Sequence, residues 1–212
     1  MKKTIWLPVV LGTVLGLLAG ISTIAKLSFL VPGTETENAF GFFITLFLLA
    51  AAQGGPLAGA IAPVIWMIAS TWYGPPEFKA ITSIPAVFWS NLIVLSALMG
   101  LIGFAYRLIY EGVRMPLRLL FWAGIVIVFY LINAPIIITS QYLLLGDIDV
   151  LPAILFGYQA YIPQVIFDIF FTSLVFIALP MRYRRPLWYE AKKAPDQSAE
   201  TQSVLYKETG DP

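Results

Sequence analysis

Six long apolar runs divide this sequence, and its basic residues lie almost entirely at alternate ends of them. The runs cover residues 4–25, 40–53, 56–73, 86–106, 119–145 and 157–180. If each run crosses a bilayer in turn, only Lys26 and Lys79 of the 13 lysines and arginines fall on the opposite side from the rest. Basic residues that flank membrane spans stay in the cytoplasm. We therefore predict an all-α bundle of six transmembrane helices, multi-pass in the cell membrane, with both termini cytoplasmic.

The composition limits the classes of function that this chain can serve. It is 59% hydrophobic and contains neither cysteine nor histidine, which excludes disulfides, thiolate metal sites and proton transfer by imidazole. We expect no enzymatic activity, no metal site and no cofactor. The net charge of +1 and the lack of a basic patch away from the membrane flanks indicate no nucleic-acid partner. Residues 1–185 are expected to form one transmembrane domain, and residues 186–212 a polar, disordered cytoplasmic tail.

Two features leave the number of crossings open. The first run is longer than the apolar core of a secretory signal, about 7–15 residues, so we expect it to be retained; its cleavage would leave five spans in the same orientation. The runs at 40–53 and 56–73 are joined by the uncharged Gln53-Gly54-Gly55-Pro56, which predicts a tight helical hairpin. Because residues 40–53 are few for a full crossing, a re-entrant pair is the alternative. It would remove two crossings and keep the orientation of the rest.

The first run carries glycines at four-residue intervals, namely Gly12, Gly16 and Gly20. This spacing places them on one helix face, where the missing side chains let another helix approach closely. Two interpretations remain open. The face contacts a neighbouring helix of the same bundle, or it docks onto a separate membrane partner.

The last run carries a polar stripe formed by Tyr161, Gln164, Asp168 and Thr172, spaced by three, four and four residues. Asp168 is expected near the middle of the bilayer. A carboxylate there costs about 2.5–3.5 kcal/mol on insertion scales and therefore faces protein or water. An ionisable side chain inside a membrane is a candidate functional residue.

Aromatic, amide and hydroxyl side chains in the outer halves of the runs suit a small, flat, mostly neutral molecule, with rings to stack on and polar groups to orient it. Asp168 would suit an amine or cationic group. The candidate substrate-binding residues are Trp66, Ser70, Trp89, Asn91, Asn133, Gln141, Tyr161, Gln164 and Asp168. The alternative is structural, because tryptophan and tyrosine anchor membrane interfaces while asparagine, glutamine and serine bond neighbouring helices.

Several of these features together resemble a known family. The six spans, the small residues spaced by four, the long external first loop and the Gly55-Pro56-Leu57-Ala58-Gly59-Ala60 segment are similar to the S components of energy-coupling factor (ECF) transporters, over about residues 4–185. In that family the S component captures a vitamin or similar nutrient from outside. The resemblance implies that Gly12, Gly16 and Gly20 dock a membrane coupling protein driven by two ATPases. This chain has glycines where alanines are usual in that family.

The resemblance favours one function and leaves a second open. The chain contains no P-loop for ATP binding, so we expect a substrate-capture subunit that takes up a small nutrient with an ATP-driven partner. The same Gly-Pro-Leu-Ala-Gly stretch also looks like the membrane-sensor region of some histidine kinases that regulate autolysis. The alternative function is therefore a non-transporting membrane scaffold or sensor-like protein, which acts through helix–helix contacts and needs no ligand cavity.

Overall fold

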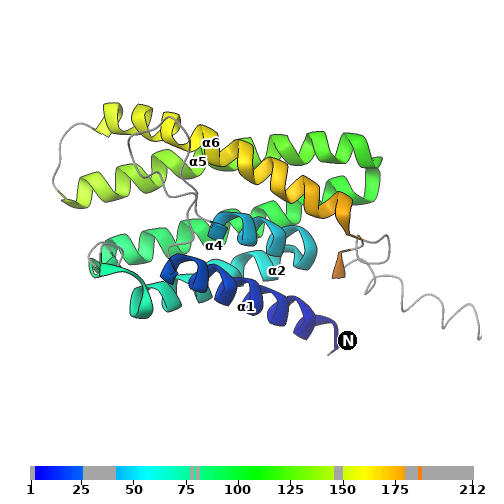
Figure 1. Ribbon diagram of the computed structural model, residues 1–212, viewed down its shortest axis with the longest axis horizontal. Coiled ribbons are helices and arrows are strands. Elements are labelled where there is room, and N and C mark those ends of the chain that lie inside the picture. Colours follow the sequence, from blue (N-terminus) through cyan, green and yellow to red (C-terminus); the bar gives the residue numbers. More distant parts are fainter. Residues whose placement is uncertain are drawn as a thin grey trace, which may run out of the picture.

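The computed structural model describes residues 3–25, 42–76, 79, 82–145, 150–179 and 186–187. Nearly all of these residues are helical, and none of them is in a strand. The helices are α1 (Lys3–Ile24), α2 (Phe42–Tyr73), α4 (Pro85–Gly112), α5 (Met115–Leu145) and α6 (Val150–Ala178) (Figure 1). Within the described part of the chain, these 5 helices are long and apolar enough to cross a membrane. The predicted all-α class is confirmed, whereas the predicted tail lies almost wholly outside the described residues.

Helix α2 folds back on itself at Gly55. The Phe43 ring stacks on the Trp66 ring with centroids 4.8 Å apart, whereas a continuous helix would separate these residues by roughly 35 Å. Gly55 has φ 75° and ψ −164°, a conformation open essentially only to glycine. We call residues 42–54 the first limb of α2 and residues 56–73 the second limb. The hairpin that the sequence predicts at this point is confirmed.

The turn of α2 packs against a glycine of α4. A Cβ atom placed on Gly103 would lie 2.6 Å from the carbonyl carbon of Gly55, so the two backbones touch. Gly103 precedes Arg107 by about one helical turn, which places the turn of α2 close to the basic end of α4. From there the first limb extends roughly 20 Å at 1.5 Å per residue, about two-thirds of a hydrocarbon core of about 30 Å.

The glycine face of α1 packs against the second limb of α2. A Cβ atom on Gly12 would lie 2.8 Å from the Ala58 carbonyl oxygen, and one on Gly16 would lie 2.6 Å from that of Ala62. Gly20 meets the next small residue of this limb, Ala69. The three glycines thus serve a contact within the bundle, as one of the two interpretations expected. A partner that used the same face would first have to displace α2.

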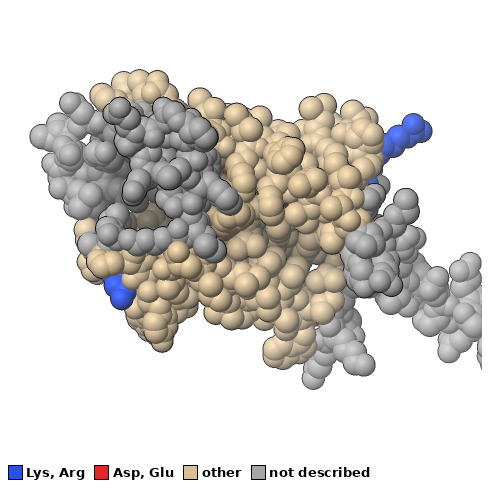
Figure 2. Space-filling model, in the orientation of Figure 1, with Lys and Arg blue, Asp and Glu red and all other residues tan. Residues whose placement is uncertain are grey.

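The helices form a bundle whose ends differ in charge from its middle. Helix α4 lies between α2 and α5, and α6 contacts both α5 and α2. In Figure 1 the start of α1, the α4–α5 turn and the end of α6 lie at one end of the long axis. Figure 2 shows basic side chains at the two ends of the visible face and a nearly uncharged band between them. This distribution is typical of a membrane protein.

Replacing Gly55 by alanine tests the turn of α2. We expect the Gly55→Ala variant to lose about 1–3 kcal/mol of unfolding free energy, because a Cβ is strained at this φ and ψ. Thermal unfolding in detergent would measure the loss. The matched control is Gly124→Ala in α5, where an added Cβ meets nothing within 4 Å; it should be neutral or slightly stabilising. Equal effects at the two positions would contradict a special role for Gly55.

Replacing Gly16 by leucine tests the contact between α1 and α2. We expect Gly16→Leu to lower the unfolding free energy by about 1–3 kcal/mol or more, because the side chain would overlap the backbone of the second limb. Val14→Leu is the control, since Val14 lies on the same helix with 46% of its surface exposed. If both variants unfolded at the wild-type temperature, the close approach of α1 and α2 would be wrong.

Candidate functional site

The side chain of Asp168 lies at the meeting point of three helices and is completely buried. Its Oδ1 atom accepts a hydrogen bond from the Thr45 hydroxyl on the first limb of α2. Its Oδ2 atom accepts one from the Tyr130 hydroxyl on α5, at 2.5 Å. The Gln164 side chain, four residues earlier on α6, also bonds to the carboxyl group. We call these four residues the Asp168 cluster; every hydrogen-bonding partner in it comes from a neutral side chain.

Packed aromatic rings close the Asp168 cluster on the side of the α4–α5 turn. The Trp122 indole donates to the Thr172 hydroxyl at 2.8 Å, and that hydroxyl donates to the Asp168 carbonyl at 2.5 Å. The Trp122 ring also contacts Tyr106 and Phe176, with centroids 5.1 and 5.5 Å away. Trp122 has no exposed surface, so this side of the cluster is filled by side chains.

Three predicted site residues, Trp66, Ser70 and Trp89, have surroundings that differ from one another. Trp66 is buried against Phe43, and its indole donates to the Thr23 hydroxyl at 2.8 Å, so it joins α1 to α2. Ser70 is buried, and its hydroxyl has no partner among the described residues. Trp89 is 57% exposed on the outside of the bundle. Its role in substrate binding stays a prediction.

Two predicted residues, Asn91 and Asn133, are buried with an unused hydrogen-bond acceptor. Asn91 lies on α4 and Asn133 on α5, with 8% and 5% of their surfaces exposed. The Oδ1 atom of each has no hydrogen-bond partner within the described part of the chain. A buried acceptor without a partner costs about 1–3 kcal/mol. These two oxygens share this state with the Ser70 hydroxyl and differ in it from the Asp168 oxygens, which accept hydrogen bonds.

Two of the remaining predicted residues, Tyr161 and Gln164, lie at or beside the Asp168 cluster. The Tyr161 ring lies 5.6 Å from that of Tyr130, and Gln164 belongs to the cluster itself. The polar stripe predicted on the last helix is therefore used as an interface within the bundle. Gln141 is part of α5, but its side chain lies outside the described set.

Two members of the Asp168 cluster, Thr45 and Tyr130, are not among the residues predicted from the sequence. Their only signal in the sequence is general, because a buried carboxyl group needs hydroxyl or amide donors from neighbouring helices. Thr45 is 123 residues away from Asp168 in the chain. Its spacing to other polar residues therefore gives no indication of the contact.

Comparisons with models of protein families, with curated proteins and with solved structures each gave no match to this chain. The geometry of the buried polar groups is therefore the main basis for a functional conclusion. The resemblance to the S components of ECF transporters stays a prediction.

Coupled substitutions in the Asp168 cluster test whether it holds the three helices together. We expect a double-mutant cycle of Thr45→Val with Asp168→Ala to give a coupling free energy of about 0.6 kcal/mol and at most about 1.7 kcal/mol, the average and the maximum measured for hydrogen bonds between membrane helices. Tyr130→Phe should couple to Asp168→Ala in the same way. The measurement is unfolding in detergent.

A hydroxyl that bonds only within its own helix provides the control for this cycle. Ser90 donates to the Val87 carbonyl on the same turn of α4, at 3.1 Å. The effect of Ser90→Ala should add to that of Asp168→Ala without coupling. Additive effects for Thr45 and Tyr130 as well would show that the Asp168 contacts contribute nothing to stability.

Proposed function

We propose that this chain is a membrane-embedded capture subunit, which binds a small, mostly neutral molecule from outside for uptake with an ATP-driven partner. The observation that carries the proposal is the pair of buried amide oxygens on Asn91 and Asn133, which have no partner among the described residues. A ligand with N–H or O–H groups would satisfy them and remove an unfavourable term of about 1–3 kcal/mol for each. Helices α4 and α5, which carry the two amides, are in contact.

The proposed topology has six crossings with cytoplasmic termini. The reversal of α2 at Gly55 supports this topology. Two limbs that each cross the bilayer add two crossings, so α1 and α4 cross in opposite directions. Arg114 and Arg118 lie at the α4–α5 turn, at the same end as the start of α1 and the end of α6 (Figure 1). Basic residues at that end support its placement in the cytoplasm.

The surroundings of Asp168 favour a neutral ligand over a cationic one. Both carboxyl oxygens already accept hydrogen bonds from Thr45 and Tyr130, so an amine would have to displace a hydroxyl group to bind there. The neighbouring Tyr161 ring offers a surface on which a flat molecule can stack. We therefore propose that Asp168 orders the inner boundary of the binding region and does not bind the ligand directly.

The proposed energy source is a separate coupling protein with ATPases, as the resemblance to S components implies. The glycine face of α1 is covered by the second limb of α2. A coupling protein would therefore either meet another face of α1 or bind after α2 has moved.

A membrane scaffold or sensor-like protein is the second candidate function. It is favoured by the contacts of Trp66 and Asp168, since both side chains are buried in bonds between helices of the same chain. Under this function Asn91 and Asn133 would also bond within the protein, and no small molecule would be retained.

Replacing Asn91 and Asn133 by leucine distinguishes the two functions. Leucine has the same branched shape and no polar atoms. If the oxygens await a ligand, we expect Asn91→Leu and Asn133→Leu to keep or raise the unfolding temperature of the empty protein, because an unpartnered acceptor has been removed. Native mass spectrometry of protein gently purified from its membranes should show a bound small molecule that both variants lose. Ser90→Ala should retain it.

The opposite pattern would support the scaffold. A fall in unfolding temperature for both variants, with no small-molecule adduct on the wild type, would mean that the amides bond neighbouring helices. An adduct retained equally by the wild type and both variants would place the ligand elsewhere.

A further inference from the structure

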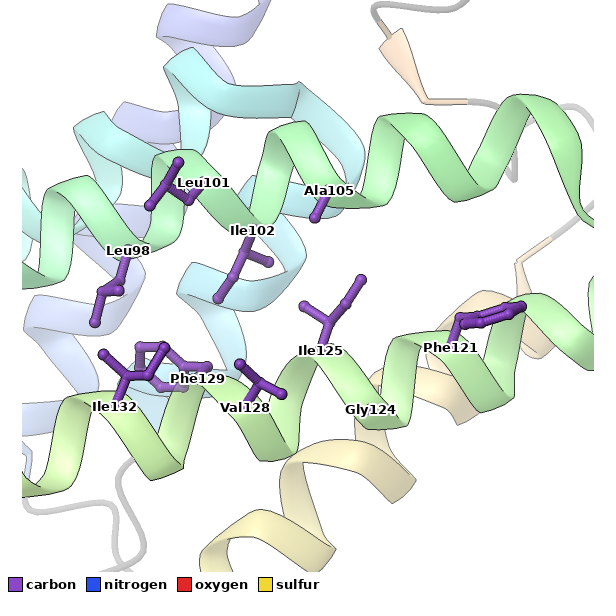
Figure 3. A pocket seen from close by; sticks show the side chains of 10 residues that line it. All are labelled: Leu98, Leu101, Ile102, Ala105, Phe121, Gly124, Ile125, Val128, Phe129 and Ile132. Atoms are coloured by element: carbon purple, nitrogen blue, oxygen red, sulfur yellow. The ribbon is translucent and has the colours of Figure 1, made fainter.

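An apolar groove runs between α4 and α5 on the side of the bundle. Its volume is about 400 Å³, and every residue that lines it is apolar. Figure 3 shows Leu98, Ile102 and Ala105 of α4 on one side and Ile125 and Phe129 of α5 on the other, with their side chains directed toward the space between the helices. The groove is separate from the Asp168 cluster and has no role in the function proposed above.

The groove opens toward the surrounding bilayer. Leu101 and Val128 line it and are 63% and 52% exposed. Gly124 lines it as well, and a Cβ atom there would meet nothing within 4 Å, so the missing side chain adds to the open space. An open space lined only by apolar side chains suits a hydrocarbon chain.

An arginine is fixed at one end of the groove. Arg118 precedes Phe121 by three residues and Ile125 by seven, and therefore lies on the groove face of α5, one turn beyond the lining. Its Nη2 atom donates to the carbonyls of Tyr110 and Val113, at 3.2 and 2.9 Å. The guanidinium lies 4.0 Å from the centre of the Tyr110 ring. These contacts hold the positive charge in one place without neutralising it.

A second arginine precedes the first by one helical turn. Arg114 immediately precedes α5 and is exposed, and its carbonyl accepts the Arg118 amide at 2.9 Å. Among the described side chains, no acidic group forms an ion pair with either arginine. Two arginines thus lie one and two helical turns beyond the groove lining of α5, and the described part of the chain provides no counterion for either.

We propose that this groove binds an anionic phospholipid of the cytoplasmic leaflet, with an acyl chain between α4 and α5 and the phosphate at Arg114 and Arg118. The chemistry of such a lipid matches that of the site. Its hydrocarbon chain suits the apolar groove, and its negative head group suits the arginines. Basic groups between membrane helices on the cytoplasmic side are suited to acidic head groups. A bound lipid would connect α4 to α5 through the groove.

Lipid-dependent unfolding tests the proposal. The full chain in detergent would be titrated with dioleoyl phosphatidylglycerol or with dioleoyl phosphatidylcholine, which has the same tails and no net charge. We expect the anionic lipid to raise the unfolding temperature more than the zwitterionic one, and to remain bound in native mass spectra. Arg114→Gln should weaken binding of the anionic lipid about tenfold, whereas Lys79→Gln, at the opposite end of the bundle, should leave it unchanged.

Filling the groove tests the place of the acyl chain. Gly124→Leu should abolish the difference between the two lipids, and Gly124→Ala, a milder change that keeps the fold, should reduce it. Ile166→Phe adds bulk to the bilayer face of α6, where Ile166 is 63% exposed, and should have no effect. Equal stabilisation by both lipids, or an unchanged lipid difference in both Gly124 variants, would overturn the proposal. A dimer of the wild type that dissociates in the Gly124→Leu variant would also overturn the proposal, since the groove would then be an interface between two copies.

Discussion

The buried carboxyl group of Asp168 is the interaction on which the arrangement of the helices depends. Inside a bilayer, apolar side chains gain little by leaving lipid for protein, so close packing and hydrogen bonds between helices must hold the bundle together. Asp168 supplies such bonds to α2 and α5 at once, through Thr45 and Tyr130. The contact between α6 and α2 is small, and the bond from Thr45 to Asp168 joins these two helices. The cost of placing a carboxyl group there is offset only while all its donors stay in position.

The two parts of the bundle are stabilised by different means. Helices α1, α2 and α4 approach through missing side chains, since Gly16 and Gly103 each lie directly against the backbone of α2. Helices α5 and α6 carry larger side chains and associate through aromatic rings and hydroxyl groups, such as Trp122 with Thr172. Small-residue contacts bring helices close, whereas bulky ones hold them apart. The groove between α4 and α5 lies where these two kinds of packing meet.

The sequence predicted those features that depend on one residue or on one helix. Gly55 marks the turn of α2 because only glycine tolerates its backbone conformation. The glycine face of α1 and the polar stripe of α6 follow from helical periodicity alone. Contacts between helices could not be predicted from the sequence. Helical periodicity identified Asp168 but not its partner Thr45, which is 123 residues away. Trp89, a predicted substrate-binding residue, is exposed on α4, and an aromatic residue near a helix end also suits the membrane interface.

Hydrogen-bond satisfaction separates the structural polar residues from the candidate binding residues more clearly than residue type does. By residue type, Asp168 is the strongest functional candidate, because it is ionisable and deep in the membrane. Its oxygens are nevertheless occupied, and a ligand would have to compete with hydroxyl groups that already fit. Asn91 and Asn133 are weaker candidates by type, but their oxygens are buried without a partner among the described residues. A buried acceptor of this kind lowers stability, and a ligand donor would remove that cost. The proposed capture function therefore depends on the two amides, while the carboxyl group bonds the surrounding helices to one another.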